Sequence, residues 1–240
     1  MSRLAISLLL PTRGRCELLR QTLEGVFSTA ADADSIEVLL YVDDDDVPSR
    51  EMPLPDARVI RHVGPAMRMG RLTNELFTRS HGEHVLLFND DIICRTPGWD
   101  HLLLGAAGRF RDGVCLAYGN DGVQGANLPT FPFLPRRTCE LLGGICPDEL
   151  RHDYIDTHLL DIFLCLRELG ADRLVYVENV LFEHLLAEKT HVLNRELQQQ
   201  DELAYLAWRD ERRYLAWRLR RACSQIDSTG EKSRQQHSRH

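Results

Sequence analysis

The feature that most constrains the fold is a series of short apolar runs, rich in β-branched residues, that alternate with stretches of helical spacing. The apolar runs are residues 4–10, 36–42, 57–63, 85–88, 114–118 and 174–177. After the first run, Leu19, Leu23 and Val26 recur on one face of a helix. Strands that alternate with helices are typical of βαβ units. The sequence therefore predicts an α/β fold, a single domain whose mostly parallel central sheet is flanked by helices.

The second half of the chain adds a loop, two helices and a tail. Residues 119–135 are rich in Gly, Asn and Pro and predict an irregular loop over the sheet edge. Residues 156–169 predict a helix that ends at Gly170. A long C-terminal helix is expected from about residue 194 to 223, before a disordered tail. The predicted parts of the chain are a domain over residues 1–192, a helical extension over 193–223 and the tail over 224–240.

Charge and cysteine content exclude some classes of protein. The net charge of -7 and the pI of about 5.8 argue against a nucleic-acid partner, which usually requires a basic surface. The seven cysteines are scattered, odd in number and form no CxxC pair, which indicates reduced thiols and no zinc site. No apolar run approaches the length of a membrane span, about 18 to 20 residues. A cytoplasmic protein is expected.

Charged clusters follow three of the predicted strands. They are PTRGR at 11–15, DDDD at 43–46 and NDD at 89–91. In open α/β sheets, ligands bind in the crevice beyond the carboxyl ends of the strands, where these clusters would meet. Carboxylates packed so closely repel one another unless a cation lies among them. The sequence therefore predicts a ligand site that contains a cation at this sheet edge.

Each cluster has a structural and a functional interpretation. The aspartates of NDD could cap the next helix, but Thr96 already precedes Pro97 as a helix cap. Asp91 is therefore expected to bind a divalent cation, because Mg²⁺ and Mn²⁺ favour carboxylate oxygens. His184 is either a half-buried histidine or a second metal ligand.

The other two clusters could bind a nucleotide or be ordinary loops. Asp43 and Asp44 directly follow a strand and could accept hydrogen bonds from a nucleobase or ribose, whereas Asp45 and Asp46 are expected to face solvent. Arg13 or Arg15 could bind a diphosphate or base through its guanidinium. Alternatively, PTRGR is a turn in which Thr12 caps the first helix.

Together these motifs resemble the inverting family 2 glycosyltransferases of the Rossmann-like GT-A fold, over roughly residues 4–185. The resembling stretches are ISLLLPTRGR, VLLYVDDDD, GRLTNELFTRSHGEHVLLFNDDI with TPGW, YIDTHLL and VYVENVLFEHL. The resemblance implies transfer of a sugar from a nucleotide-sugar donor to a saccharide or lipid-linked acceptor, with Mn²⁺ or Mg²⁺ as cofactor. It points to surface polysaccharide or glycoconjugate synthesis.

The resemblance also implies roles for individual residues. The nucleotide-binding residues would be Pro11, Thr12, Arg13, Arg15, Asp43, Asp44, Arg71, Asn74, Asn89 and Asp90. Asp91, at the last position of the DxD motif, and His184 would hold the metal, and Asn89 replaces the first Asp of that motif. Asp156 would be the general base that accepts the proton of the acceptor hydroxyl, with Asp153 as the rival. For Asp156, the structural alternative is a helix cap.

Two other functions remain open. Asp43-x-Asp45-x-Val47 also resembles the signature of HAD-like phosphatases, in which the first Asp is the nucleophile. The chain could also be a catalytically silent GT-A-like binding module, because Asn89 departs from the DxD motif and no second acidic residue adjoins Asp156.

The C-terminal helix is basic and aromatic, with YLAWR at residues 205–209 and again at 214–218. Such a helix could make peripheral contact with the inner face of an anionic membrane. The favoured alternative is that Leu203, Leu206 and the tryptophans pack on the domain or form a homodimer.

Overall fold

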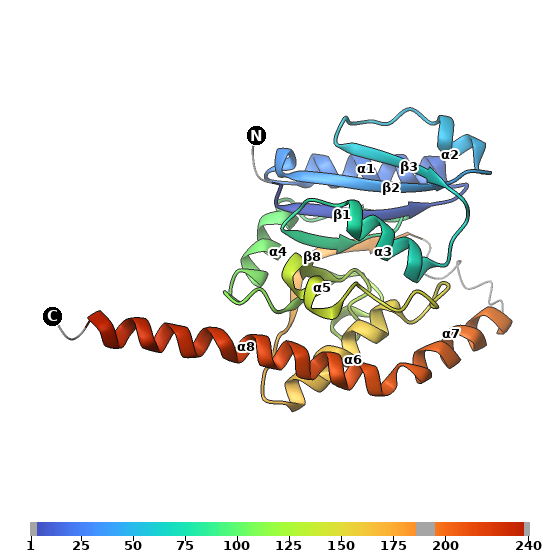
Figure 1. Ribbon diagram of the computed structural model, residues 1–240. Helices are drawn as coiled ribbons and strands as arrows, with labels where there is room; N and C mark the ends of the chain where they lie inside the picture. The colour runs from blue at the N-terminus through green and yellow to red at the C-terminus, as the bar shows by residue number, and fades with distance from the viewer. Residues whose placement is uncertain (1–3, 186–194, 238–240) are drawn as a thin grey trace.

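The structure is a computed structural model that describes residues 4–185 and 195–237 (Figure 1). The elements follow in the order β1 (Ile6–Thr12), α1 (Cys16–Thr29), η1 (Ala33–Ser35), β2 (Ile36–Asp43), α2 (Val47–Glu51), β3 (Val59–Gly64), α3 (Met69–Arg79), β4 (His84–Leu87), β5 (Ile92–Cys94), α4 (Trp99–Ala107), β6 (Leu116–Asn120), η2 (Gly125–Asn127), β7 (Phe133–Pro135), α5 (Arg136–Leu142), α6 (Ile155–Glu168), β8 (Leu174–His184), α7 (Arg195–Ala207) and α8 (Arg209–His237). The predicted α/β fold is confirmed.

One sheet contains the strands in the order β3-β2-β1-β4-β7-β6-β8-β5. Strands β3, β2, β1 and β4 are mutually parallel, and β6 is parallel to β8. Strand β7 is antiparallel to β4 and β6, and β5 is antiparallel to β8. The mostly parallel sheet is as predicted. The prediction of an irregular loop at 119–135 was wrong in part, because β7 lies within it and joins the two halves of the sheet.

The core lies on both faces of this sheet. Leu8 and Leu10 of β1 face one buried cluster together with Trp99 of α4, whereas Leu9 faces a second cluster with Phe163 of α6. Successive side chains of a strand point to opposite faces, so a strand covered on both sides is apolar throughout. This is why β1 appears in the sequence as a continuous apolar run.

Two predicted helix caps are wrong. Arg15, and not Thr12, occupies the N-cap position of α1. Gly98 occupies that of α4 in the left-handed conformation, with φ of 72°. The Thr96 hydroxyl instead donates to the carbonyl of Asn179 and accepts from the backbone N–H of Leu181, which ties this turn to β8.

The C-terminal region forms two helices where the sequence predicted one, and they run along the side of the domain opposite β3 (Figure 1). Helix α8 continues to His237, past the predicted start of the tail at residue 224. Leu215 and Leu219 of α8 are buried in the cluster that contains α6, so this helix packs on the domain. Leu203 and Leu206 are exposed, so they do not pack on the domain, and their packing in a homodimer stays a prediction. Within the described residues, no helix is long and apolar enough to cross a membrane.

Candidate functional site

The carboxyl ends of β1, β2 and β4 meet at one edge of the sheet. Strand β1 pairs in parallel with both neighbours, so that Thr12 lies beside Val42 and Leu9 lies beside Leu87. The segments that follow these strands therefore converge. The three charged clusters predicted to meet at this edge are in contact, as the hydrogen bonds below show.

Arg13 joins the first cluster to the second. Its Nη1 lies 2.6 Å from an oxygen of Asp43 and 2.6 Å from one of Asp45, and its Nη2 donates to the other oxygen of Asp45 at 2.8 Å. Hydrogen bonding to Asp45 and Asp43 raises the pKa of Arg13, and the guanidinium lowers the pKa of Asp45. Arg13 and Asp45 are exposed, so water screens this pair, and both groups can exchange partners when a ligand binds.

Asp46 differs from its prediction as a solvent-facing residue, because it is buried. Its carboxylate accepts hydrogen bonds from the backbone N–H of Gly14 at 2.7 Å and of Ser49 at 3.5 Å, which caps α2. Burial acts to raise the pKa of Asp46, but hydrogen bonds from Ser49 and Gly14 outweigh it and lower the pKa. Asp46 therefore fixes the PTRGR turn against the end of β2, while Asp44 is exposed.

Arg15 and Thr12 join the first cluster to the third. Arg15 Nη1 lies 3.1 Å from Asp90 Oδ1 and 3.1 Å from Asp91 Oδ2, and the Thr12 hydroxyl donates to Asp90 Oδ2 at 2.7 Å. Both aspartates are buried, and burial raises the pKa of Asp90 despite the opposing effects of Thr12 and Arg15. The guanidinium thus supplies a positive charge between two adjacent carboxyl groups. Asn89 is exposed beside them.

Asp91 and His184 come together through the antiparallel pairing of β5 with β8. Ile92 lies opposite His184, and the backbone N–H of Leu185 donates to the carbonyl of Asp91 at 3.0 Å. Asp91 Oδ1 lies 3.3 Å from His184 Nε2, close enough for an ion pair with a protonated ring. The same oxygen is buried and accepts no hydrogen bond. The sequence spacing could not show this proximity, because strand pairing between residues far apart in the chain creates it.

These two side chains are enough ligands, and of the right chemistry, for the predicted divalent cation. Residues 4–185 and 195–237 contain no group of three or more His, Cys, Asp or Glu that could hold a metal. Mg²⁺ and Mn²⁺ do not require such a cage, because water and substrate phosphates complete the shell around one or two protein ligands. A buried carboxylate oxygen that accepts no hydrogen bond, next to an imidazole nitrogen, suits a metal ion whose other ligands are the oxygens of a diphosphate.

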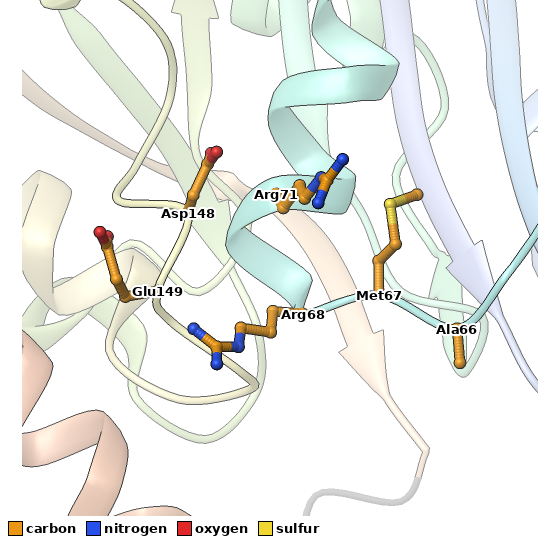
Figure 2. Close-up of a pocket in the computed structure, with 6 residues that line it drawn as sticks. All are labelled: Ala66, Met67, Arg68, Arg71, Asp148 and Glu149. Carbon is orange, nitrogen blue, oxygen red and sulfur yellow. The ribbon is translucent and has the colours of Figure 1, made fainter.

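A pocket of about 420 Å³ lies where β3 leads into α3. Its lining residues are Ala66, Met67, Arg68, Arg71, Asp148 and Glu149 (Figure 2). Figure 2 shows Arg68 and Arg71 at the start of α3, across from the loop that carries the two acidic residues. Arg71 thus lines a pocket at the predicted end of the sheet. Reasoning from sequence missed Arg68, although the run RMGR that opens the predicted helix is a basic signal.

Asn74 makes its side-chain hydrogen bonds within the protein. Its amide nitrogen donates to the carbonyl of Cys146 at 2.8 Å and to Asp148 at 2.7 Å, and its oxygen accepts from the backbone N–H of Ile145 at 2.8 Å. Both polar atoms are engaged within the protein. Asn74 therefore holds the loop that lines the pocket, and its place beside the diphosphate stays a prediction.

The predicted acceptor-side carboxylates lie around the start of α6. Tyr154 occupies the N-cap position with φ of 70°, so Asp156 lies inside the first turn and is not the helix cap. Asp156 Oδ1 accepts hydrogen bonds from the backbone N–H and the hydroxyl of Thr157, at 2.7 and 3.3 Å. Burial raises the pKa of Asp156, the Thr157 hydrogen bonds oppose it, and nearby Asp153 adds to the increase. Asp153 itself is half-buried.

Comparisons with known proteins bear on the fold. No protein-family model matches the sequence, and no curated protein is significantly similar to it. The solved structures that resemble it include mannosyltransferase PcManGT from Pyrobaculum calidifontis with GDP-Man and Mn²⁺, which is 14% identical with a TM-score of 0.64 and a match over 96% of this chain and 76% of that one.

Two further structures are similar. Glucosyl-3-phosphoglycerate synthase from Mycobacterium tuberculosis is 17% identical, with a TM-score of 0.57 over 85% of this chain and 79% of that one. S. aureus TarS in complex with UDP is 14% identical, with a TM-score of 0.51 over 74% of this chain and 59% of that one. At these identities the likeness establishes the architecture, and the chain has the GT-A fold of these glycosyltransferase structures.

Proposed function

We propose that this protein is a metal-dependent, inverting glycosyltransferase that moves a sugar from a nucleotide-diphosphate donor to an acceptor hydroxyl. The observation that carries the proposal is the open, buried oxygen of Asp91 beside His184, at the sheet edge where the nucleotide-binding candidates converge. A GT-A neighbour with GDP-Man and Mn²⁺ supports the same donor class and cofactor.

On the donor side, Asp91 and His184 would hold the cation. When bound, Mn²⁺ or Mg²⁺ supplies Lewis-acid stabilisation of the negative charge on the departing diphosphate. Arg13 and Asp43 form a screened pair that can open toward a base or ribose, with exposed Asp44 beside them. Arg68 and Arg71 line the pocket at the start of α3 together with Asp148 and Glu149, and their guanidinium groups suit phosphate oxygens.

On the acceptor side, Asp156 would take the proton from the attacking hydroxyl, with Asp153 as the alternative. A raised pKa makes a carboxylate a stronger base and brings it closer to the operating pH. Attack from the face opposite the diphosphate is a single displacement, which inverts the anomeric carbon. We assign the acceptor to the saccharides or lipid-linked saccharides of surface polysaccharide or glycoconjugate synthesis.

The donor assignment is tested by a thermal-shift screen of UDP-, GDP-, dTDP- and CMP-sugars with Mn²⁺ or with EDTA. A ligand that binds the folded state raises its melting temperature. At least one donor should raise Tm with Mn²⁺ and lose most of that effect in EDTA. No shift with any donor would contradict the proposed function.

Two alternatives are separated by activity. A silent binding module would bind a donor without hydrolysing it or transferring its sugar. Asn89, which replaces the first aspartate of the DxD motif, is the reason to test this alternative. A HAD-like phosphatase would need Asp43 as a free nucleophile, but Arg13 engages both Asp43 and Asp45. Aryl phosphate turnover that Asp43→Asn abolishes would support the phosphatase.

We also propose that the outer face of α8 contacts an anionic membrane. Tyr214 and Trp217 are exposed and stack with ring centroids 5.8 Å apart, and Arg218 and Arg221 lie over these rings. Residues 213–221 contain four arginines and no acidic residue, although the chain is acidic, whereas Arg212 is buried beside Asp161. Aromatic and basic side chains together suit a negatively charged lipid surface.

Vesicle co-sedimentation tests this contact. Vesicles rich in phosphatidylglycerol should bind the protein more than phosphatidylcholine vesicles do, and Trp217→Ser should weaken that binding. Val123→Ser is the matched control, because Val123 is also an exposed apolar residue but lies far from α8 in sequence. Equal binding to both vesicles, or a dimer in solution that Trp217→Ser disrupts, would contradict the membrane assignment.

A further inference from the structure

Asp201 of α7 is a buried carboxylate that organises the segment before α6. Its Oδ1 accepts a hydrogen bond from the backbone N–H of Arg151 at 2.8 Å. Its Oδ2 accepts from the backbone N–H groups of His152 at 2.8 Å and Asp153 at 2.9 Å. A buried carboxylate is costly unless hydrogen bonds replace its water. Three consecutive amides satisfy this carboxylate, and in return their backbone is fixed in one conformation.

The next residue of that segment is held from the same helix. Tyr154 adopts a left-handed backbone conformation with φ of 70°, which is uncommon for a residue other than glycine and persists only where the surroundings enforce it. Its ring stacks on that of Tyr205, with centroids 4.9 Å apart. Asp201 and Tyr205 are four residues apart in α7 and therefore lie on the same helix face.

A third contact holds α6 itself. The Tyr205 hydroxyl donates to Asp161 Oδ2, and Arg212 Nε lies 3.4 Å from the same oxygen. The guanidinium of Arg212 also lies over the Tyr205 ring, 4.0 Å from its centroid. The chain on both sides of Asp156 is thus attached to α7 and the start of α8.

We propose that α7 positions the acceptor-side carboxylates and that Asp201 is the positioning residue for Asp153 and Asp156. This role rests on the function proposed above. Asp201 is buried and acts through the backbone of residues 151–153. A general base works only when it is held in reach of the attacking hydroxyl, and small displacements of such a group cost much of the rate.

The experiment compares Asp201→Asn with Asp210→Asn. The first substitution replaces one acceptor oxygen with an N–H donor that faces backbone N–H groups, while Asp210 is exposed and serves as the matched control. Amide hydrogen exchange at residues 151–153 should be at least tenfold faster in Asp201→Asn. With a donor from the thermal-shift screen, the kcat of sugar transfer by Asp201→Asn should be at least tenfold below that of wild type, with little change in the KM for the donor. The acid limb of the pH profile of kcat should also shift.

The control should match wild type in every measurement. Unchanged exchange in Asp201→Asn, or faster exchange with unchanged kcat and pH profile, would overturn the positioning role. If Asp201→Asn does not fold, Tyr205→Leu keeps the carboxylate and removes the stack on Tyr154, and unchanged kcat and pH profile in that variant would overturn the positioning role of α7. Wild-type protein that binds a donor but transfers no sugar would contradict the proposed function, whereas the exchange result reports on Asp201 alone.

Discussion

Asp91 Oδ1 lies 3.3 Å from His184 Nε2, and this buried oxygen accepts no hydrogen bond. An open carboxylate beside an imidazole is a donor pair for a divalent cation. His184→Ala should therefore weaken binding of Mn²⁺ in the presence of a nucleoside diphosphate about 10–100-fold, as loss of a metal ligand or its immediate support does. The free Mn²⁺ signal in electron paramagnetic resonance measures this directly. His101→Ala, at an exposed histidine, is the control.

Arg15 supplies the charge that balances Asp90 and Asp91. Arg15→Gln should lower the free energy of unfolding at pH 7 by about 1–3 kcal/mol, since the guanidinium is partly exposed and the carboxyl groups are buried. The loss should be smaller at pH 5, because the pKa of Asp90 is raised and protonation of the folded state relieves the repulsion.

The matched control for Arg15→Gln is Arg20→Gln, because Arg20 forms an exposed ion pair with Glu17 on α1. Millimolar Mn²⁺ should restore more stability to Arg15→Gln than to the control, because a bound cation replaces the missing charge. Urea unfolding at both pH values measures these differences. An equal loss at pH 7 and pH 5 would contradict the charge-balancing role.

His158 should make stability depend on pH. It is buried against Trp208, and burial, together with the charge of Arg212, lowers its pKa to about 3. The unfolded chain takes up this proton near pH 6.5 and the folded chain does not, so stability is lost as pH falls below about 6.5.

The slope from His158 is at most about 1.4 kcal/mol per pH unit. His158→Gln should therefore flatten the stability profile between pH 6.5 and 4.5 relative to wild type, whereas His101→Gln should leave it unchanged. Denaturant midpoints across this range provide the measurement. A wild-type slope that survives in His158→Gln would show that another group is responsible.

Two helical glycines should respond in opposite ways to alanine. A Cβ on Gly70 would lie 2.0 Å from the carbonyl oxygen of Pro147, whereas a Cβ on Gly105 would meet nothing within 4 Å. Gly70→Ala should destabilise the protein by about 1–3 kcal/mol through overpacking. Gly105→Ala should stabilise it by up to about 1 kcal/mol through helix propensity. Thermal unfolding of both variants checks the pair, and equal effects would be inconsistent with the tight contact between α3 and the pocket loop.

Asp156, the proposed general base, is tested by replacement with asparagine, which has nearly the same shape but cannot accept the proton. Asp156→Asn should reduce kcat about 100–10,000-fold, the range that general-base catalysis contributes. Donor binding should be unchanged, because Asp156 lies on the acceptor side. Asp153→Asn should reduce kcat less if Asp156 is the base, and the reverse order would assign the base to Asp153. Initial rates of sugar transfer, with donor affinity measured separately, distinguish these outcomes.

The apolar runs in the sequence predicted the six longer strands but not the two short ones. Strands β5 and β7 are three residues each, too short for periodicity to identify, and long-range pairing defines them. The clusters at the strand ends were predictable because parallel topology places them together. The burial of Asp46 and the role of Asn74 were not, since both depend on backbone N–H groups and carbonyls brought close by folding. The role of Asp201 was also not predictable, because in the sequence it is only one acidic residue in a polar helix.

The central claim is that Asp91 and His184 hold the cation of a nucleotide-diphosphate. Calorimetric titration of wild type and Asp91→Asn with the nucleoside diphosphate of the best donor, with Mn²⁺ and with EDTA, tests it most directly. Wild type should bind at least tenfold more tightly with Mn²⁺ than in EDTA, and Asp91→Asn should bind with the same weak affinity in both. Equal affinity of wild type with and without Mn²⁺, or an undiminished Mn²⁺ effect in Asp91→Asn, would contradict the claim.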